Sequence, residues 1–383
     1  MSSANDFDYL SPGSVYLDTA CQSLRPRPVI EALNDYYTSY NSCGERVKHD
    51  WGKRVDEKVT ATRKRLLDYV GLSSKDYIVS FTLNTTYGLN LLLSQLRPDG
   101  IDKIITSDIE HNSVFLSTMS FASRSDVERI VVERGDDGSF PLDLDYTRAL
   151  VVVNTVSNID GRELSNIVEL IDVVHKSGGI IIIDAAQTLA HAKHLLEKTK
   201  ADAFCFSAHK AYAPSLGGIV WHRSLRDRCQ PSFIGGGMVE DVTATGYSLA
   251  THEPHTLFEA GLQAYGEIIA FGAALDWLGR QDQSALHEQS QTLFDALDRL
   301  PKVTLINHSV SSTLSFYHKN LDAHLIAEVL SDESIMARSG YFCCHYYLLH
   351  EQKLPPLVRL SLGLHTTDAD IEKTRHILER ILA

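Results

Sequence analysis

The sequence predicts an α/β fold, with a large domain built on a mostly parallel central sheet flanked by helices and a smaller α+β C-terminal domain. From about Lys58 onward, short continuous Ile/Val runs alternate with amphipathic stretches, which is typical of strands covered on both faces by helices. After about Pro254 the pattern changes to longer helices and fewer strands. We expect an N-terminal segment over 1–20, a large domain over 21–255 and a small domain over 256–383.

Short apolar runs predict the strands of the large domain, and amphipathic spacing between them predicts the helices. The predicted strands are Ile78–Thr82, Lys103–Ser107, Val127–Val132, Ala149–Asn154, Gly179–Asp184, Ala203–Ser207 and Gly218–His222. The predicted helices are Tyr87–Gln95, Asn166–Ser177 and Thr188–Thr199. Ligands of open parallel sheets bind outside the carboxyl ends of the strands, so the polar residues that follow each strand are the first candidates for a site.

The same reasoning predicts the elements of the small domain. Its helices are expected at Gly261–Gln281, Ser284–Leu300, Ala323–Leu330 and Asp368–Leu382. Its strands are expected near Val303–Ile306, Ser312–Phe316 and Val358–Leu362.

The composition of the chain argues against several classes of protein, namely nucleic-acid binders, disordered chains and membrane proteins. The 383 residues carry 36 lysines and arginines against 49 aspartates and glutamates, a formal net charge of −13. This acidic balance argues against a nucleic-acid partner, because phosphate contacts need a basic face. A hydrophobic content of 44% excludes disorder as the main state. No apolar run approaches the ~20 residues that span a bilayer, and the polar, acidic start lacks the pattern of a signal peptide. We therefore expect a cytoplasmic protein with no membrane partner.

The cysteines do not form a recognisable framework. They are Cys21, Cys43, Cys205, Cys229, Cys343 and Cys344. None forms a C-x-x-C pair or has metal-ligand spacing with histidines, so we expect no metal site. Scattered thiols in a chain of this length fit a reducing compartment.

Two strand ends carry ionisable residues whose surroundings are apolar. Asp184 ends a run of four isoleucines, so its carboxylate is expected to be partly buried and to need a cation or several donors. Both a structural ion pair and a partner for a cationic ligand atom fit this position. Lys210 follows the apolar strand 203–207. A desolvated lysine loses part of its preference for the charged form and becomes a competent amine nucleophile.

Two further strand ends complete a chemical pattern. Thr85 and Thr86 open a helix, where they serve either as an anion site or as an ordinary cap. His111 follows the second strand, either as a capping residue or as a flat ring that stacks on a ligand. An anion site, a buried acid, an imidazole and a nucleophilic lysine are together what pyridoxal 5'-phosphate needs. The combination predicts this cofactor more specifically than any one member does.

Several short motifs run in a fixed order along the chain. Residues 207–214 read S-A-H-K-A-Y-A-P, residues 184–187 read D-A-A-Q, residues 85–90 read T-T-Y-G-L-N, and Glu110 precedes His111. Together they resemble the class V aminotransferase-like, fold type I pyridoxal-phosphate enzymes, and within them the cysteine desulfurase and selenocysteine lyase branch. The resemblance extends from Tyr16 to Arg359. It implies cofactor contacts, which we list here: Asp184 to the pyridine nitrogen, Gln187 to the ring hydroxyl oxygen, His111 stacked on the ring, Lys210 bonded to the aldehyde carbon, and Thr85, Thr86, Ser207 and His209 at the phosphate.

Three C-terminal and central segments bear on the substrate. Residues 157–161 resemble the family's S-N-x-x-G turn, which implies that Asn158 lies near the substrate. Arg359 resembles the arginine that grips the substrate carboxylate, a bidentate task suited to a guanidinium. Residues 338–343 read R-S-G-Y-F-C where desulfurases have R-T-G-x-x-C. The resemblance implies that Cys343 takes sulfur as a persulfide, whereas a buried core cysteine is the alternative.

The resemblance implies a desulfurase that converts L-cysteine to L-alanine, with Lys210, Cys343 and His111 as catalytic residues. It also implies a homodimer and a separate protein that accepts the sulfur. A selenocysteine lyase, another C–S lyase, and a class V aminotransferase or epimerase remain alternatives within the fold. A sulfur carrier or interaction scaffold with a degenerate site is an alternative of another class. A Rossmann oxidoreductase is disfavoured because no G-x-G-x-x-G follows the first strand.

Three positions depart from the family pattern. Leu262 follows F-E-A-G at 258–261, where the family commonly has a threonine that reaches the phosphate of the neighbouring subunit. Leu83 stands where desulfurases often have arginine, and Tyr341 and Phe342 replace a pair of histidines. These changes predict a more apolar substrate pocket, which leaves room for a different substrate.

Overall fold

A computed structural model describes residues 6–44, 47–197, 199–250 and 253–383. Within these residues the large sheet has seven strands in the order β2-β8-β7-β6-β5-β3-β4. Their bounds are β2 Tyr77–Thr82, β3 Lys103–Ser107, β4 Glu128–Val132, β5 Ala149–Asn154, β6 Ile180–Asp184, β7 Ala203–Ser207 and β8 Gly217–His222. β8 runs antiparallel to both of its neighbours, and the other strands of the sheet are parallel to one another. The predicted mostly parallel sheet is confirmed, with β6 at its centre.

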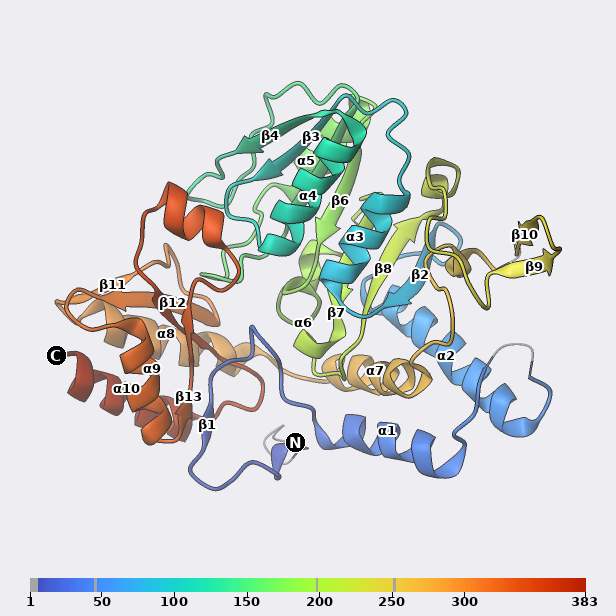
Figure 1. Ribbon diagram of the computed structural model, residues 1–383. Coiled ribbons are helices and arrows are strands. Elements are labelled where there is room, and N and C mark those ends of the chain that lie inside the picture. Colours follow the sequence, from blue (N-terminus) through green and yellow to red (C-terminus); the bar gives the residue numbers. More distant parts are fainter. Residues whose placement is uncertain (1–5, 45–46, 198, 251–252) are drawn as a thin grey trace.

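Helices cover both faces of this sheet, as Figure 1 shows. Their bounds are α1 Arg27–Ser39, α2 Asp50–Tyr69, α3 Thr85–Gln95, α4 Asn112–Ser125, α5 Ile167–Lys176, α6 Thr188–His191 and α7 Tyr265–Leu278. Alternate residues of one strand supply opposite faces. Ile181 and Ile183 join the cluster that contains α1, α2, α5 and α7, whereas Ile180 and Ile182 join the cluster that contains α3 and α4. This period of two places an apolar side chain on each face and explains the continuous isoleucine run.

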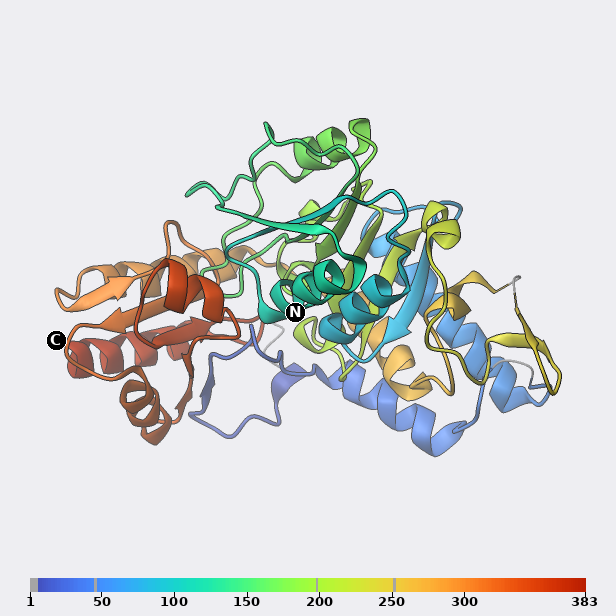
Figure 2. The same cartoon turned by 45° about the horizontal axis from the view of Figure 1, so that its top comes forward.

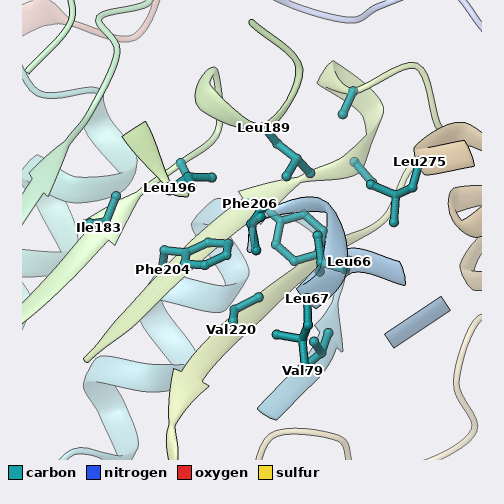
Figure 3. Packing of buried hydrophobic residues seen from close by; sticks show 14 of the residues in the cluster. Leu66, Leu67, Val79, Ile183, Leu189, Leu196, Phe204, Phe206, Val220 and Leu275 are labelled. Atoms are coloured by element: carbon teal, nitrogen blue, oxygen red, sulfur yellow. The ribbon is translucent and has the colours of Figure 1, made fainter. Parts of the chain in front are cut away.

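The first of these clusters contains both phenylalanines of β7. Phe204 and Phe206 of β7 pack with Ile183, Leu66 and Leu275 (Figure 3). The Phe206 and Phe271 rings are stacked with centroids 5.4 Å apart. The strands that deliver the candidate residues are therefore held in a close-packed core, which fixes the positions of their carboxyl ends.

The C-terminal unit is an α+β layer beside the large sheet, in the orange and red part of Figure 2. Its sheet has the order β11-β12-β15-β14. The elements are α8 Ser284–Asp298, β11 Val303–Leu305, β12 Thr313–His318, α9 Ala323–Asp332, β13 Ile335–Met336, β14 Arg338–Gly340, β15 Leu357–Ser361 and α10 Asp368–Leu382. The N-terminal strand β1, Val15–Tyr16, pairs in parallel with β13. The chain start therefore lies against the C-terminal unit, and it brings Asp18 and Cys21 to the junction between the two layers.

A two-stranded hairpin, β9 Val239–Val242 and β10 Tyr247–Leu249, projects from the large unit (Figures 1 and 2). Among the described helices, none combines the length and the apolar character needed to cross a lipid bilayer.

The predicted strands agree with the structure to within two residues at each end, and two helix predictions need correction. The helix expected at Thr188–Thr199 ends at His191, because Ala192 has φ −144° and ψ 43°, and a short 3₁₀ turn follows. The helix expected from Gly261 begins at Tyr265. Gly261 itself has φ +82°, a left-handed conformation that does not belong to a helix. The predictions missed the helices α1, α2 and α4 and the short strands β1, β9, β10, β13 and β14.

The division into 1–20, 21–255 and 256–383 stays a proposal. Two packing facts bear on it. α7 lies beyond the second boundary in the sequence, and it packs on α1 and α2 as part of the large core. Val15 and Leu17 belong to the core cluster of the C-terminal unit.

Candidate active site

A cavity of about 250 Å³ lies at the carboxyl ends of the central strands, between the large sheet and the C-terminal unit. Every site residue expected from the sequence lines it: Thr85, Thr86, His111, Asn158, Asp184, Gln187, Ser207, His209, Lys210, Cys343 and Arg359. The structure thus brings the whole predicted set together, although its members lie up to 274 positions apart in the sequence.

The floor of the cavity is a buried acid and a half-buried amine, which lie at the ends of neighbouring strands. Asp184 ends β6, is 4% exposed, and accepts a hydrogen bond of 2.8 Å from the Ala186 N–H at Oδ1. Burial raises the pKa of Asp184 to about 6, and the nearby charge of Lys210 acts in the opposite direction. Lys210 lies in the 3₁₀ turn after β7, where burial lowers its pKa and the charge of Asp184 partly offsets this effect. Each group makes the charged form of the other less costly.

One end of the cavity is built to receive an anion. Asn84 caps α3 by accepting a hydrogen bond of 2.9 Å from the Tyr87 N–H. The Thr85 N–H donates to Ser207 Oγ at 3.0 Å, and the two hydroxyl oxygens of Thr85 and Ser207 are 2.7 Å apart. A Cβ at Gly217 would lie 2.4 Å from the Cα of Asn84, so only glycine allows β8 to approach the helix start this closely. Backbone N–H groups and hydroxyls at a helix N-terminus suit a phosphate.

His111 lies over the cavity as the N-cap of α4. Its Nδ1 accepts a hydrogen bond of 3.0 Å from the Ser113 N–H, which assigns the ring proton of the neutral form to Nε2. Burial, together with the nearby cations Lys210 and Arg359, lowers the pKa of His111 to about 3. The ring is therefore neutral at physiological pH, as a stacking partner for an electron-poor ring should be.

Glu110 anchors the loop that carries His111. Its carboxylate accepts hydrogen bonds of 2.9 Å from both the N–H and the side-chain amide of Asn154, and one of 2.5 Å from Ser107 Oγ. Burial raises the pKa of Glu110 to about 7, and the nearby Arg134 opposes this. From the sequence, Glu110 was part of a motif but had no assigned role. The structure shows that its hydrogen bonds to Asn154 connect the loop before His111 to β5.

Gln187 and His209 complete the wall on the side of the N-terminal segment. Gln187 Nε2 donates to the carbonyl oxygen of Ala20 at 2.8 Å. The His209 carbonyl accepts from the Ser23 N–H and Oγ, each at 3.0 Å. Burial lowers the pKa of the His209 ring to about 4. The segment before α1 is therefore a structural part of the site.

Arg359 faces the cavity from β15 and is 2% exposed. Its Nη2 donates to Asp18 Oδ1 at 3.1 Å and its Nη1 to the Asn158 carbonyl at 2.9 Å. The guanidinium carbon lies 4.7 Å from the centre of the Phe342 ring. Nε is buried and has no hydrogen-bond partner within the described part of the chain. A buried guanidinium with an unused donor is suited to a carboxylate that arrives from the cavity.

Cys343 and Cys344 have opposite environments. Cys343 is exposed and lines the cavity, whereas Cys344 is fully buried and its Sγ donates to Asn158 Oδ1 at 3.1 Å. Burial raises the pKa of the Cys344 thiol well above its usual range. Cys343 is therefore the thiol that a substrate can reach, and Cys344 supports Asn158.

The loop that carries Cys343 is held in an unusual backbone conformation. Phe342 and Cys343 have φ angles of 47° and 59°, which non-glycine residues adopt only at a cost. Two hydrogen bonds hold them there: Asn158 Nδ2 donates to the Phe342 carbonyl at 2.9 Å, and the Asn112 N–H donates to the Cys343 carbonyl at 2.6 Å.

Asp18 and Cys21 were not assigned a role in the site from the sequence, and the contacts that both make with Arg338 were not predicted. Asp18 lies 3.1 Å from Arg359 and 3.6 Å from Arg338, so one carboxylate bridges both guanidinium groups. Arg338 Nη1 also donates to Cys21 Sγ. A single sequence gives no signal for these contacts, because they join positions 317 and 341 residues apart.

The groups of the cavity fit pyridoxal 5'-phosphate. The cradle of Thr85 and Ser207 suits its phosphate, the buried Asp184 suits a protonated ring nitrogen, and Lys210 suits its aldehyde. The residues described contain no group of three or more His, Cys, Asp or Glu side chains placed to hold a metal ion.

Comparison with known proteins agrees with this geometry. The sequence model of the family "Aminotransferase class-V" matches residues 15–374. The chain is similar to a probable cysteine desulfurase of Pyrococcus abyssi, with 30% identity over 96% of this chain and 94% of that protein. It is 28% identical to a cysteine desulfurase of Escherichia coli O157:H7, over 96% of this chain and 93% of that protein.

A solved structure of similar fold is the apo form of a cysteine desulfurase from Thermococcus onnurineus NA1. It superposes with a TM-score of 0.87 at 29% identity, over 96% of this chain and 94% of that chain. The match spans both the large sheet and the C-terminal unit.

Proposed function

The chain belongs to the class V aminotransferase family, and from this premise we propose that it is a pyridoxal 5'-phosphate-dependent cysteine desulfurase. It converts L-cysteine to L-alanine and holds the sulfur as a persulfide on Cys343. One observation carries the proposal: an accessible thiol, Cys343, shares a cavity with the pair of Lys210 and Asp184.

When bound, the cofactor supplies an electron sink for the carbon next to the substrate nitrogen. Asp184 would hold the ring nitrogen and Lys210 the aldehyde carbon. Thr85, Thr86, Ser207 and His209 would hold the phosphate, Gln187 the ring hydroxyl oxygen, and His111 one face of the ring. The hydrogen bond between Thr85 and Ser207 and the neutral ring of His111 support these assignments.

Arg359 and Asn158 orient the substrate. The carboxylate of the amino acid takes the place of Asp18 on the Arg359 guanidinium and uses its free Nε–H. The Asn158 carbonyl continues to hold Nη1, so the guanidinium keeps its orientation during the exchange. Binding energy from the carboxylate thus fixes the α-carbon close to Lys210.

Lys210 acts as the base. Its burial favours the neutral amine, and a neutral amine can take the α-proton at Nζ. The Cys343 thiolate then attacks the substrate sulfur. The new bond joins Cys343 Sγ to that sulfur, the bond between the sulfur and the β-carbon breaks, and its electron pair stays with the carbon that becomes the methyl group of alanine after protonation.

The test is a single-turnover assay on protein loaded with pyridoxal 5'-phosphate. We expect L-cysteine to yield alanine, and mass spectrometry to find one added sulfur atom on Cys343. A Cys343→Ser variant should retain the absorbance of the bound cofactor and lose both products. Alanine formation at an undiminished rate by this variant would show that the desulfurase proposal is wrong. Cys43→Ser, which changes an exposed cysteine outside the cavity, is the matched control.

A second candidate acts at the same site on a different substrate, as a selenocysteine lyase, another C–S lyase, or a class V aminotransferase or epimerase. The apolar Phe342 ring beside Arg359 favours it, because the family pattern has a histidine there. Parallel assays with selenocysteine and cysteine sulfinate, with alanine and released sulfide measured, separate these activities.

A homodimer and a sulfur-acceptor protein are part of the same proposal. Leu262 and Leu83 are 75% and 65% exposed. Exposed side chains of this size support burial against a second copy. The expected cytoplasmic location is supported by six free thiols.

A further inference from the structure

The cavity contains a second thiol that the reaction above does not use. Cys21 lines it together with Cys343 and Lys210, and is partly exposed. Its Sγ accepts a hydrogen bond from Arg338 Nη1. Arg338 lies on β14, five residues before Cys343, so the strand that leads into the Cys343 loop also contacts the Cys21 sulfur.

Arg338 is the cation in direct contact with the Cys21 sulfur. Lys210 and Arg359 line the same cavity, and a negative charge on Cys21 would raise the pKa of both groups. Asp18 holds Arg338 and Arg359 in place from the other side. Reactive cysteines are found in electropositive, partly exposed surroundings of this kind.

The donor that receives the substrate carboxylate lies in the same cavity as Cys21. Arg359 Nε is buried without a hydrogen-bond partner among the described residues, and it is available to an anion when no substrate is bound. The cavity that Cys21 lines is therefore suited to a negatively charged sulfur species.

We propose that Cys21 is a second sulfur-carrying residue, which accepts the terminal sulfur atom from the persulfide on Cys343. This inference rests on the proposed desulfurase function and extends it. The Cys21 thiolate attacks the outer sulfur of the Cys343 persulfide. A bond forms between Cys21 Sγ and that sulfur, the bond between it and Cys343 Sγ breaks, and Cys343 leaves as a thiolate. The transfer is an exchange between two thiols and consumes no oxidant or reductant.

The transfer has a functional consequence. Cys343 is exposed and becomes free for a second substrate, while the sulfur waits on a residue held by Arg338. In the absence of an acceptor or reductant, each chain stores two sulfur atoms. The initial burst of alanine is then about two per chain in the wild type and about one per chain in Cys21→Ser.

The experiment maps sulfur on the full-length protein loaded with pyridoxal 5'-phosphate. After brief treatment with L-cysteine, persulfides are capped by alkylation and located by mass spectrometry of the peptides. We expect added sulfur on both Cys21 and Cys343 in the wild type, on Cys343 alone in Cys21→Ser, and on neither in Cys343→Ser. Cys43, an exposed cysteine outside the cavity, serves as the internal control and should carry no added sulfur.

The outcomes are separable. Sulfur on Cys343 with none on Cys21 overturns this inference and leaves the desulfurase proposal standing. Sulfur on Cys21 in the Cys343→Ser variant overturns the transfer step, because the sulfur then arrives without Cys343. Absence of both alanine and sulfur adducts overturns the desulfurase proposal and this inference with it.

A second measurement needs no turnover. In the protein without substrate, the alkylation rate of Cys21 reports the nucleophilic reactivity of its sulfur. Arg338→Gln removes the guanidinium that donates to the Cys21 sulfur, so it should slow this labelling by about tenfold and leave the labelling of Cys43 unchanged. Equal labelling rates for Cys21 in both proteins would show that Arg338 does not activate it.

Discussion

The cavity has two halves with different physical character. Asp184 and Ser207 end β6 and β7 and are buried, Lys210 follows β7 and is half-buried, and all three rest on a close-packed core. On the opposite side, Cys343 is exposed on a loop and Cys21 is partly exposed on the segment before α1. The first half can be called the sheet half and the second the sulfur half.

The two halves hold their side chains in place by different means. In the sheet half, strand pairing and core packing fix the side chains, and water is excluded so that pKa values shift. In the sulfur half, a few hydrogen bonds hold backbone of left-handed conformation at Phe342 and Cys343. Chemistry that needs a fixed, dry environment is thus placed on the sheet, and chemistry that must reach an external acceptor is placed on exposed segments.

The largest effect is expected in the sheet half. Lys210→Ala removes the base and the amine that would hold the cofactor, so kcat should fall by about 10³-fold or more. Alanine formation measured beside a Lys64→Ala control, which changes an exposed lysine on α2, checks this. A fall of less than tenfold would mean that the sheet half does not carry the chemistry.

A smaller effect is expected where the two halves meet. Arg359→Lys keeps the charge and loses the fork that serves Asp18, Asn158 and the substrate carboxylate together. We expect kcat/KM to fall about 10- to 100-fold, mostly through KM, as for loss of charged hydrogen bonds. Steady-state kinetics with cysteine measure it. An unchanged KM would exclude Arg359 as the carboxylate site.

Acid sensitivity should originate in the sheet half. The pKa of His111 is about 3 in the folded protein, against ~6.5 when unfolded, so the unfolded chain binds more protons between these values. The contribution of neutral His111 to folding stability is therefore fully present above about pH 6.5, and it is lost as the pH falls from there toward 3. His111→Gln should reduce this slope by up to about 1.4 kcal/mol per pH unit.

Urea titrations of the cofactor-free protein over the acid range give the slope. His345→Gln is the matched control, because His345 is an exposed histidine of the sulfur half. Equal slopes for wild type and His111→Gln would contradict the assignment of acid sensitivity to the sheet half.

The smallest effect is expected for a substitution of Cys344, the buried neighbour of Cys343. Cys344→Ser keeps a donor for Asn158 Oδ1, so activity should change by less than about threefold. The same substitution at Cys343 should abolish desulfuration. If Cys344→Ser lost activity as completely as Cys343→Ser, the contrast between the exposed and the buried thiol would have no functional meaning.

The sequence predicted the sheet half well for a physical reason. Strands buried on both faces read as continuous apolar runs, so Ala203–Ser207 was located to the residue. The polar side chains at strand ends then follow from the rule that parallel strands present their carboxyl ends together. Asp184 and Lys210 could thus be placed before the structure was known.

The remainder depends on contacts that a single sequence does not encode. The Cys21–Arg338 contact joins positions 317 residues apart, and the anchoring of Gln187 to Ala20 joins positions 167 apart. The early end of α6 depends on the backbone at Ala192, which no proline or glycine marks. α1 and α2 were missed because the alternating pattern that guided the assignment begins only near Lys58.

The most direct test is to reduce the cofactor-loaded protein with borohydride and to map the peptides. The account rests on the Nζ of one lysine at the end of β7 being joined to the aldehyde carbon of the vitamin. It predicts a pyridoxyl group on Lys210 and on no other lysine. An adduct located elsewhere, or no adduct at all, would contradict it.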